Sequence, residues 1–206
     1  MGELHLMLCD RHTPARDIFY KYYTQVAEWI PYVLCVLILL FCRIGDGVFA
    51  TSALVLSGLF TQIIKHICNT LRPVTYFDLF MPDVQLPLVE GVKMNYWYSF
   101  PSGHTTSFFS LALVASVLIT NYLTDHRPDL PHSGLKAQRF FSAAIQMLLF
   151  ILAALGGYSR IYLSQHFARD VFGGMIIGIG ITIVCYVVFI QYKDRKWYNF
   201  RLFQKK

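Results

Sequence analysis

Long apolar runs alternate with shorter polar connections along almost the whole chain. A helix that crosses a lipid bilayer needs about 20 mainly apolar residues. Five stretches meet that requirement, and they cover residues 27–43, 47–68, 102–123, 139–158 and 170–192. The pattern predicts an all-α integral membrane helical bundle, in which residues 1–206 form a single domain.

The segment 14–28, ahead of the first apolar run, mixes charged and aromatic residues. This mixture is typical of an amphipathic helix that lies in the membrane interface. A shortened sixth span would give a similar pattern. The N-terminal region is therefore expected to hold either an interfacial helix or an additional crossing.

Small residues in the last two spans point to close helix packing. Gly174 and Gly178 form a GxxxG pattern, and Gly156 and Gly157 lie near the end of the preceding span. Glycine lets two membrane helices approach closely because it has no side chain. We expect these glycines to serve packing rather than ligand binding.

Composition agrees with a membrane protein and excludes several other classes. Hydrophobic residues make up 55% of the 206 residues and charged residues only 15%, compared with roughly 25% charged in an ordinary globular domain. The net charge of +6 is compatible with a nucleic-acid partner, but the long apolar runs argue against one. The five cysteines are widely spaced and form no CxxC pair, so we expect neither a disulfide framework nor a zinc site.

Charged residues near the ends of the spans are the candidates for chemistry, because charge is costly inside a membrane. The first group is Lys65 and Arg72, with Pro73 after them. On one helix the two cations would share a face, two turns apart, and the proline favours an extended Arg72 and an end to the helix. The pair can bind a phosphate dianion, or it can simply extend to the interface from a helix end.

The second group is Pro101-Ser102-Gly103-His104, at the start of the third apolar run. Unpaired N–H groups at a helix N-terminus suit an anion. Gly103 lets a ligand approach the backbone, Ser102 can cap the helix or donate to a phosphate oxygen, and His104 can move protons. A plain helix cap beside an incidental histidine is the alternative.

The third group is Ser159-Arg160, followed by His166 and Asp170. On a helix His166 and Asp170 are four residues apart and meet on one face. A carboxylate there can accept the Nδ1–H of the imidazole and leave Nε2 free as a nucleophile. A purely structural His–Asp hydrogen bond is the alternative.

The order of the spans brings the three groups to one side of the membrane. The first group closes the second span, the second group opens the third span, and the third group joins the fourth span to the fifth. Because successive spans run in opposite directions, all three groups are expected on the same membrane face.

Together the three groups resemble the three-part signature of the type 2 phosphatidic acid phosphatase (PAP2) superfamily. The match in residue type, spacing and order covers residues 65–170. One motif alone would be weak, whereas three in order are specific. The high apolar content fits the membrane branch of the family rather than its soluble haloperoxidases.

The resemblance implies a role for each matching residue. His166 would attack phosphorus and form a phosphohistidine, Asp170 would orient His166, and His104 would protonate the leaving oxygen and then activate water. The expected phosphate-binding residues are Lys65, Arg72, Ser102, Gly103, Ser159 and Arg160. The resemblance implies no cofactor and no metal, and three cations with a helix N-terminus can supply the charge stabilisation that Mg²⁺ gives elsewhere. A neutral His166 and a protonated His104 predict a bell-shaped pH profile.

The distribution of Lys and Arg predicts the orientation in the membrane. Ten of the eighteen lie on the face opposite the site, and they are Arg43, Arg127, Lys136, Arg139, Lys193, Arg195, Lys196, Arg201, Lys205 and Lys206. Positive residues favour the cytoplasmic side. The chain is therefore expected in the inner (cytoplasmic) membrane, with its site facing the periplasm or exterior.

The expected partners are the lipid bilayer and a membrane lipid phosphate. The compact size is similar to bacterial family members, which implies undecaprenyl pyrophosphate, lipid A phosphate or phosphatidylglycerol phosphate as substrate. A phosphotransferase that passes phosphate to an acceptor other than water is the alternative enzyme. A non-catalytic lipid-binding or transport protein is the alternative outside enzymes, and the complete signature disfavours it.

Overall fold

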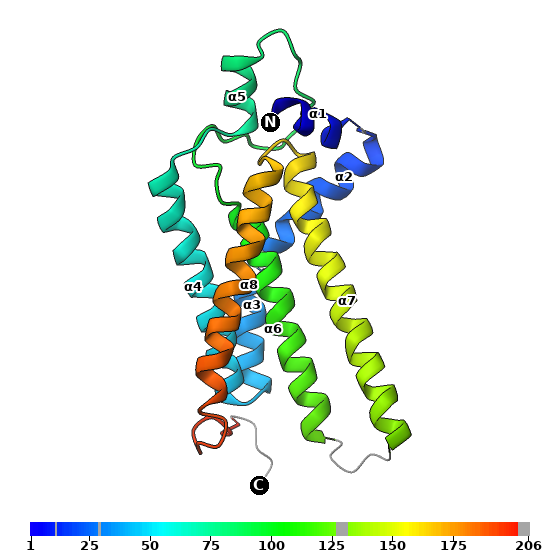
Figure 1. Cartoon of the computed structure of the whole chain (residues 1–206), viewed down its shortest axis with the longest axis vertical. Helices are drawn as coiled ribbons and strands as arrows, with labels where there is room; N and C mark the ends of the chain where they lie inside the picture. Colours follow the sequence, from blue (N-terminus) through cyan, green and yellow to red (C-terminus); the bar gives the residue numbers. More distant parts are fainter. Residues whose placement is uncertain (11, 29, 127–131, 202–206) are drawn as a thin grey trace.

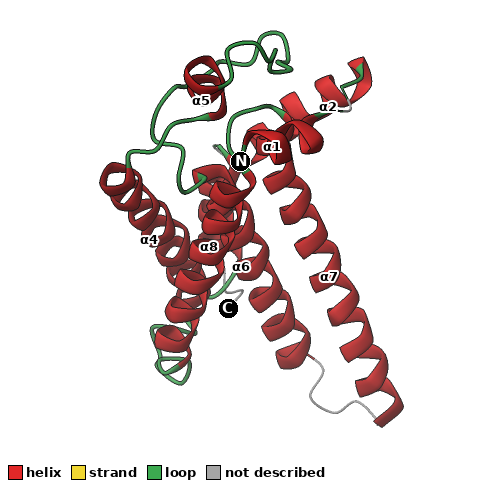
Figure 2. Ribbon diagram, turned by 45° about the horizontal axis from the view of Figure 1, so that its top comes forward, coloured by secondary structure: helices red, strands yellow, loops and turns green. Residues whose placement is uncertain are grey.

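The computed structural model describes residues 1–10, 12–28, 30–126 and 132–201, and this part is helical, without a strand (Figure 2). The elements in chain order are α1 (Gly2–Cys9), α2 (Pro14–Tyr23), the 3₁₀ helix η1 (Thr24–Ala27), α3 (Ile30–Phe41), α4 (Ile44–Cys68), α5 (Pro73–Phe80), α6 (Gly103–His126), α7 (His132–Tyr162) and α8 (Ala168–Ile190). The predicted all-α fold is confirmed.

Four helices in the described residues, α4, α6, α7 and α8, are long and apolar enough to cross a membrane. They correspond to four of the five predicted spans, although α7 begins earlier and ends later than the predicted 139–158. The helices run side by side along the length of the molecule (Figure 1). The chain is a multi-pass membrane protein.

The first predicted span, 27–43, differs from the prediction. Its helical part is α3, which has 12 residues and is therefore about 18 Å long at 1.5 Å per residue. The predicted helix at 14–28 also divides, into α2 and η1. Local hydropathy did not reveal these breaks.

This N-terminal segment nevertheless joins the two ends of the bundle. At one end, Thr24 accepts a hydrogen bond from Arg160 at 2.7 Å. At the other end, the N–H groups of Ile44 and Gly45 donate to the carbonyls of Phe200 and Tyr198. Helices α1, α2 and α5 lie at the first end, and residues 191–201 after α8 lie at the second (Figure 1).

Helix α6 is central, because it packs against α4, α7 and α8. A Cβ at Gly174 would lie 2.5 Å from the carbonyl oxygen of Ser102, and one at Gly178 would lie 2.5 Å from that of Thr106. No side chain fits at such distances. The predicted packing role of these two glycines is confirmed, and it brings the start of α8 against the start of α6.

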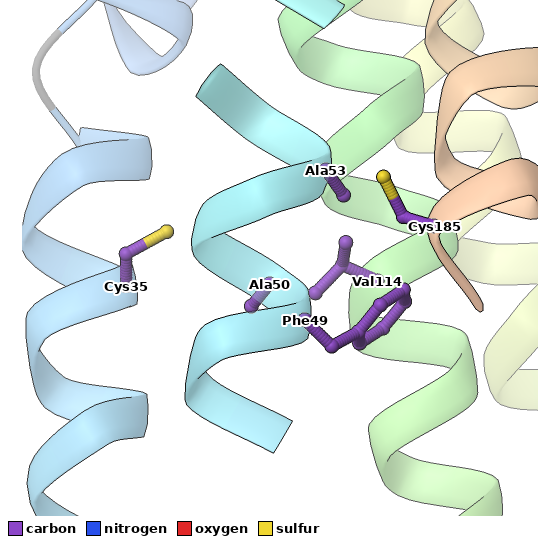
Figure 3. Packing of buried hydrophobic residues seen from close by; sticks show 6 residues of the cluster. All are labelled: Cys35, Phe49, Ala50, Ala53, Val114 and Cys185. Atoms are coloured by element: carbon purple, nitrogen blue, oxygen red, sulfur yellow. The ribbon is translucent and has the colours of Figure 1, made fainter. Parts of the chain in front are cut away.

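One apolar core cluster lies between four helices and includes two of the cysteines. Residues from α3, α4, α6 and α8 form it (Figure 3), namely Cys35, Phe49, Ala50, Ala53, Val114 and Cys185. All five cysteines are free, as expected. Polar contacts tie the same helices together nearer the site, for example Thr61 to Thr106 at 3.1 Å.

Candidate active site

Lys65 and Arg72 approach each other through a turn and not along one helix. Helix α4 ends at Cys68, and Asn69 takes a left-handed conformation with φ 39°. Arg72 is extended and caps α5, whose first residue is Pro73. The predicted shared helix face is therefore wrong, because a left-handed residue ends the helix one turn after Lys65. The predicted extended conformation of Arg72 is confirmed, but Pro73 begins a helix instead of ending one.

Backbone carbonyls of the segment before α6 fix both cations. Lys65 Nζ donates to the carbonyl of Tyr98 at 2.7 Å, and Arg72 Nε donates to that of Trp97 at 3.0 Å. Tyr98 has φ 57°, a region that residues other than glycine rarely adopt. Both cations are buried, so these carbonyls orient their charges without neutralising them.

Arg160 lies near the end of α7 and is 6% exposed. Its Nη1 donates to Thr24 Oγ1 at 2.7 Å, and its Nη2 lies 3.5 Å from Gln165 Oε1. Its Nε is buried and has no hydrogen-bond partner. A buried donor without a partner is rare, and a bound anion would satisfy it.

The start of α6 supplies the second predicted group. Ser102 Oγ accepts from the Thr105 hydroxyl at 2.9 Å and from the Thr105 N–H at 3.4 Å. This is the helix-capping arrangement that the sequence left open. A Cβ at Gly103 would meet Lys65 Cε only at 3.9 Å, so the glycine leaves space beside that cation. His104 Nε2 lies 3.4 Å from Glu28 Oε1.

His166 lies in the turn between α7 and α8 and is 1% exposed. It precedes α8, so its predicted position on the same helix as Asp170 is wrong, although the two side chains still lie next to each other. The Nδ1 atom of His166 is 3.8 Å from Asp170 Oδ2, which is too long for a hydrogen bond. Ser99 contacts both groups instead, since its hydroxyl donates to Asp170 Oδ2 at 2.5 Å and lies 3.4 Å from His166 Nδ1.

Burial is the main cause of the electrostatic state of His166. It lowers the pKa of His166 well below the ordinary value, and the nearby Arg72, Arg160 and Lys65 lower it further. A histidine in such surroundings is neutral near pH 7. A neutral imidazole is the form that can act as a nucleophile.

One cavity of about 520 Å³ brings most of the predicted residues together. Six of them line it, namely Lys65, Arg72, Gly103, His104, Arg160 and His166. Ser102, Ser159 and Asp170 do not line it. The hydroxyl of Ser159 donates to the carbonyl of Gly156 at 2.6 Å inside α7.

The site contains residues that the sequence reasoning missed. Ser99 contacts the His166–Asp170 pair, Gln165 and Thr24 contact the arginines, and Glu28 contacts His104. Gln165 lies inside the third motif, and Ser99 is the single small polar residue between an aromatic run and Phe100. Nothing in the local pattern marked Thr24 or Glu28. Among the described residues, no group of three or more His, Cys, Asp or Glu side chains could hold a metal ion.

The sequence profile of the PAP2 superfamily matches residues 46–194. The match covers most of the chain and the whole of the cavity's cation cluster. The chain therefore belongs to the PAP2 superfamily, and it is a membrane phosphatase of the PAP2 type.

Two curated proteins are similar over most of the chain. The lipid A 4'-phosphatase of Porphyromonas gingivalis is 27% identical over 199 residues, which cover 93% of this chain and 74% of that protein. Lipid phosphate phosphatase 2 of Arabidopsis thaliana is 29% identical over 201 residues, which cover 89% of this chain and 66% of that protein.

Two solved structures share the fold. The crystal structure of Aquifex aeolicus LpxE aligns with a TM-score of 0.65 and 25% identity, over 90% of this chain and 93% of that one. The PAP2-type phosphatidylglycerolphosphate phosphatase from Bacillus subtilis aligns with a TM-score of 0.69 over 95% of this chain and 87% of that one. At 20% identity the second likeness concerns the fold alone.

Proposed function

We propose that this chain is a metal-independent lipid phosphatase that works through a phosphohistidine on His166. The observation that carries the proposal is the single cavity that His166, His104 and the cations Lys65, Arg72 and Arg160 line together. A neutral histidine, a second histidine and three cations can supply the nucleophile, the proton transfer and the charge stabilisation of an in-line phosphoryl displacement.

In the first step, His166 Nε2 forms a bond to phosphorus while the bond from phosphorus to the leaving oxygen breaks. His104 gives a proton to that oxygen. In the second step, His104 takes a proton from water, the water oxygen bonds to phosphorus, and the bond from phosphorus to His166 breaks. Inorganic phosphate leaves, and both histidines return to their starting states.

The phosphoryl oxygens would bind Lys65, Arg72 and Arg160, together with the N–H of Gly103. Asp170 would orient His166 through Ser99, which contacts both groups. Ser102 Oγ accepts from Thr105 at the start of α6, the Ser159 hydroxyl donates within α7, and neither residue lines the cavity. In this proposal they support the helix ends that carry Gly103 and Arg160, rather than bind phosphate as first expected.

The substrate class follows from the membrane fold and the relatives. The proposed substrates are lipid A phosphate, undecaprenyl pyrophosphate and phosphatidylglycerol phosphate, all of which carry acyl or prenyl chains that stay in a bilayer. Similarity over 93% of the chain to a lipid A 4'-phosphatase makes a lipid A phosphate the first substrate to assay.

For the membrane arrangement, we propose five crossings in a single domain of residues 1–206. The segment η1–α3 would make the first crossing, because Thr24 contacts the site end and Ile44 contacts the opposite end. The C-terminal tail would face the cytoplasm and the cavity the periplasm or exterior of the inner membrane. Of the residues used to predict this orientation, Arg127, Lys205 and Lys206 lie outside the described residues.

The test is phosphate release in detergent from a panel of the three lipids. We expect release from at least one lipid, with unchanged activity after dialysis against EDTA. Strict dependence on an added divalent metal would contradict the proposal. Loss of lipid phosphate without free phosphate, but with a phosphorylated acceptor, would assign the chain as a phosphotransferase.

A further inference from the structure

Gln165 is a buried polar residue that the proposed chemistry does not use. It lies in the turn between α7 and α8, directly before His166, and is 2% exposed. Its backbone N–H donates to the carbonyl of Arg160 at 3.0 Å. It does not line the cavity that contains His166, so it would act on the reaction through other residues.

The amide oxygen of Gln165 lies between two of the phosphate-binding cations. Arg72 Nη1 donates to Gln165 Oε1 at 3.2 Å and to the backbone carbonyl of Gln165 at 3.3 Å. Arg160 Nη2 lies 3.5 Å from the same Oε1. One oxygen therefore faces both guanidinium groups, although Arg72 precedes α5 and Arg160 belongs to α7.

The amide nitrogen of Gln165 contacts the segment that leads to α6. Nε2 donates to the carbonyl of Lys93 at 3.1 Å and lies 3.0 Å from Met94 Sδ. A few residues later, the carbonyls of Trp97 and Tyr98 bind Arg72 and Lys65. The amide of Gln165 thus connects the turn between α7 and α8, which contains His166, to the segment that orients the cations.

Charge explains why an amide suits this position. In the described part of the chain, no carboxylate oxygen lies within 4.0 Å of a side-chain nitrogen of Lys65, Arg72 or Arg160, and their hydrogen bonds go to neutral oxygens. A carboxylate at position 165 would have the same shape and would bind both arginines more strongly. It would also compensate the positive charge that an incoming phosphate needs.

We propose that Gln165 is a positioning residue that orients Arg72 and Arg160 toward the phosphoryl group while leaving their charge to the substrate. The inference rests on the proposed function of the cavity. The proposal predicts that phosphate binding depends on the neutral charge of residue 165 as much as on its hydrogen bonds.

The test compares Gln165→Glu with Gln165→Met, which keeps the length of the side chain but removes its hydrogen bonds. Gln85→Glu is the matched control, because Gln85 is exposed in the loop after α5 and makes the same charge change. Two quantities are measured for each variant in detergent: kcat and KM for the lipid substrate, and the Kd of inorganic phosphate from the concentration dependence of the melting temperature.

For Gln165→Glu we expect a melting temperature at or above that of the wild type, and KM and the phosphate Kd raised about 10- to 100-fold. For Gln165→Met we expect a rise of about 3- to 10-fold in both, since orientation is lost but charge is kept. Gln85→Glu should match the wild type. If Gln165→Glu does not fold, the KM and phosphate Kd of Gln165→Met alone test the proposal.

Wild-type KM and phosphate Kd in Gln165→Glu would overturn the inference, and so would wild-type values in Gln165→Met. Failure of the proposed function has a different signature. In that case the wild type would release no phosphate from any lipid, whereas the effect of Gln165→Glu on phosphate binding would still measure the role of Gln165.

Discussion

Two polar clusters at opposite ends of the bundle, one partly buried and one buried, bind their cations in different ways. At the tail end, Arg43 Nε lies 2.9 Å from Asp46 Oδ2, and Tyr198 donates to Asp46 Oδ1 at 2.8 Å. At the cavity end, Lys65 and Arg72 donate to backbone carbonyls. The first cluster contains its own counter-charge, and the second leaves positive charge for a ligand.

The cluster around Asp46 serves the structure, whereas the cations around the cavity serve ligand binding. The Asp46 cluster joins the C-terminal tail to the start of α4, where Gly45 and Ile44 also bond to the tail backbone. Because Asp46 neutralises the charge of Arg43, this ion pair stabilises the packing of the tail but does not attract an anion. Buried cations that no carboxylate contacts directly are costly, so their presence around one cavity indicates a function.

The largest expected effect is that of His166→Ala, which removes the proposed nucleophile and leaves the cations in place. We expect phosphate release from lipid to fall at least about 10⁴-fold, while inorganic phosphate still raises the melting temperature. Turnover is measured as phosphate released per enzyme. Activity within tenfold of the wild type would rule out His166 as the nucleophile.

The two clusters can be compared directly with Arg72→Leu and Arg43→Leu. Loss of Arg72 should lower kcat/KM about 10²- to 10³-fold, because a charge that stabilises the transition state is removed. Loss of Arg43 should lower the melting temperature by several °C and change kcat/KM by less than about twofold. Similar losses of kcat/KM in both variants would show that the contrast between the clusters has no functional meaning.

A smaller effect is expected from Ser99→Ala. The Ser99 hydroxyl contacts both His166 and Asp170, so its loss should lower kcat about tenfold, or about 1.4 kcal/mol in the barrier. The Kd of inorganic phosphate should stay constant, since Ser99 does not line the cavity. A changed phosphate Kd with unchanged kcat would assign Ser99 to the cation cluster instead.

The smallest expected effect concerns how the stability of the fold depends on pH through the buried side chain of His5. Burial lowers the pKa of His5 to about 4, although Asp170 opposes the shift. Above pH 6.5 His5 is neutral in both the folded and the unfolded chain. As the pH falls from 6.5 toward 4 the unfolded chain binds a proton that the folded chain does not, so stability decreases across this window.

His5→Gln should therefore show a smaller fall in melting temperature between pH 7 and pH 4.5 than the wild type, by a few °C. His5 lies beside the turn between α7 and α8, because its Nε2 is 3.4 Å from Ser164 Oγ; the same Nε2 is 3.4 Å from Cys9 Sγ. An identical pH dependence in the two proteins would show that the titration of His5 is not coupled to folding.

The fold was largely predictable because lipid imposes simple rules on sequence. Runs of about 20 apolar residues identify long spans, and α4, α6, α7 and α8 follow them. The glycines of α8 were predictable for the same reason. The division of residues 14–28 into α2 and η1 was not, because hydropathy does not encode contacts such as Thr24 with Arg160.

The candidate site was predictable in membership but not in geometry. The motifs named all six residues that line the cavity with the proposed chemistry. Helical periodicity then predicted the wrong helix positions for Arg72 and His166. Asn69 ends α4 before Arg72, and α8 begins after His166. Ser99 contacts His166 across 67 residues of sequence and Gln165 contacts Arg72 across 93, and no local pattern contains that information.

The measurement that tests the account most directly is rapid quenching of the wild type and of His166→Ala with a ³²P-labelled lipid phosphate. Phosphohistidine is stable in base and labile in acid, so the quench is alkaline. We predict label on the wild-type chain within one turnover, mapped to the peptide that contains His166, and no label on His166→Ala. Label on a different residue, or equal labelling of His166→Ala, would contradict a phosphohistidine mechanism at this site.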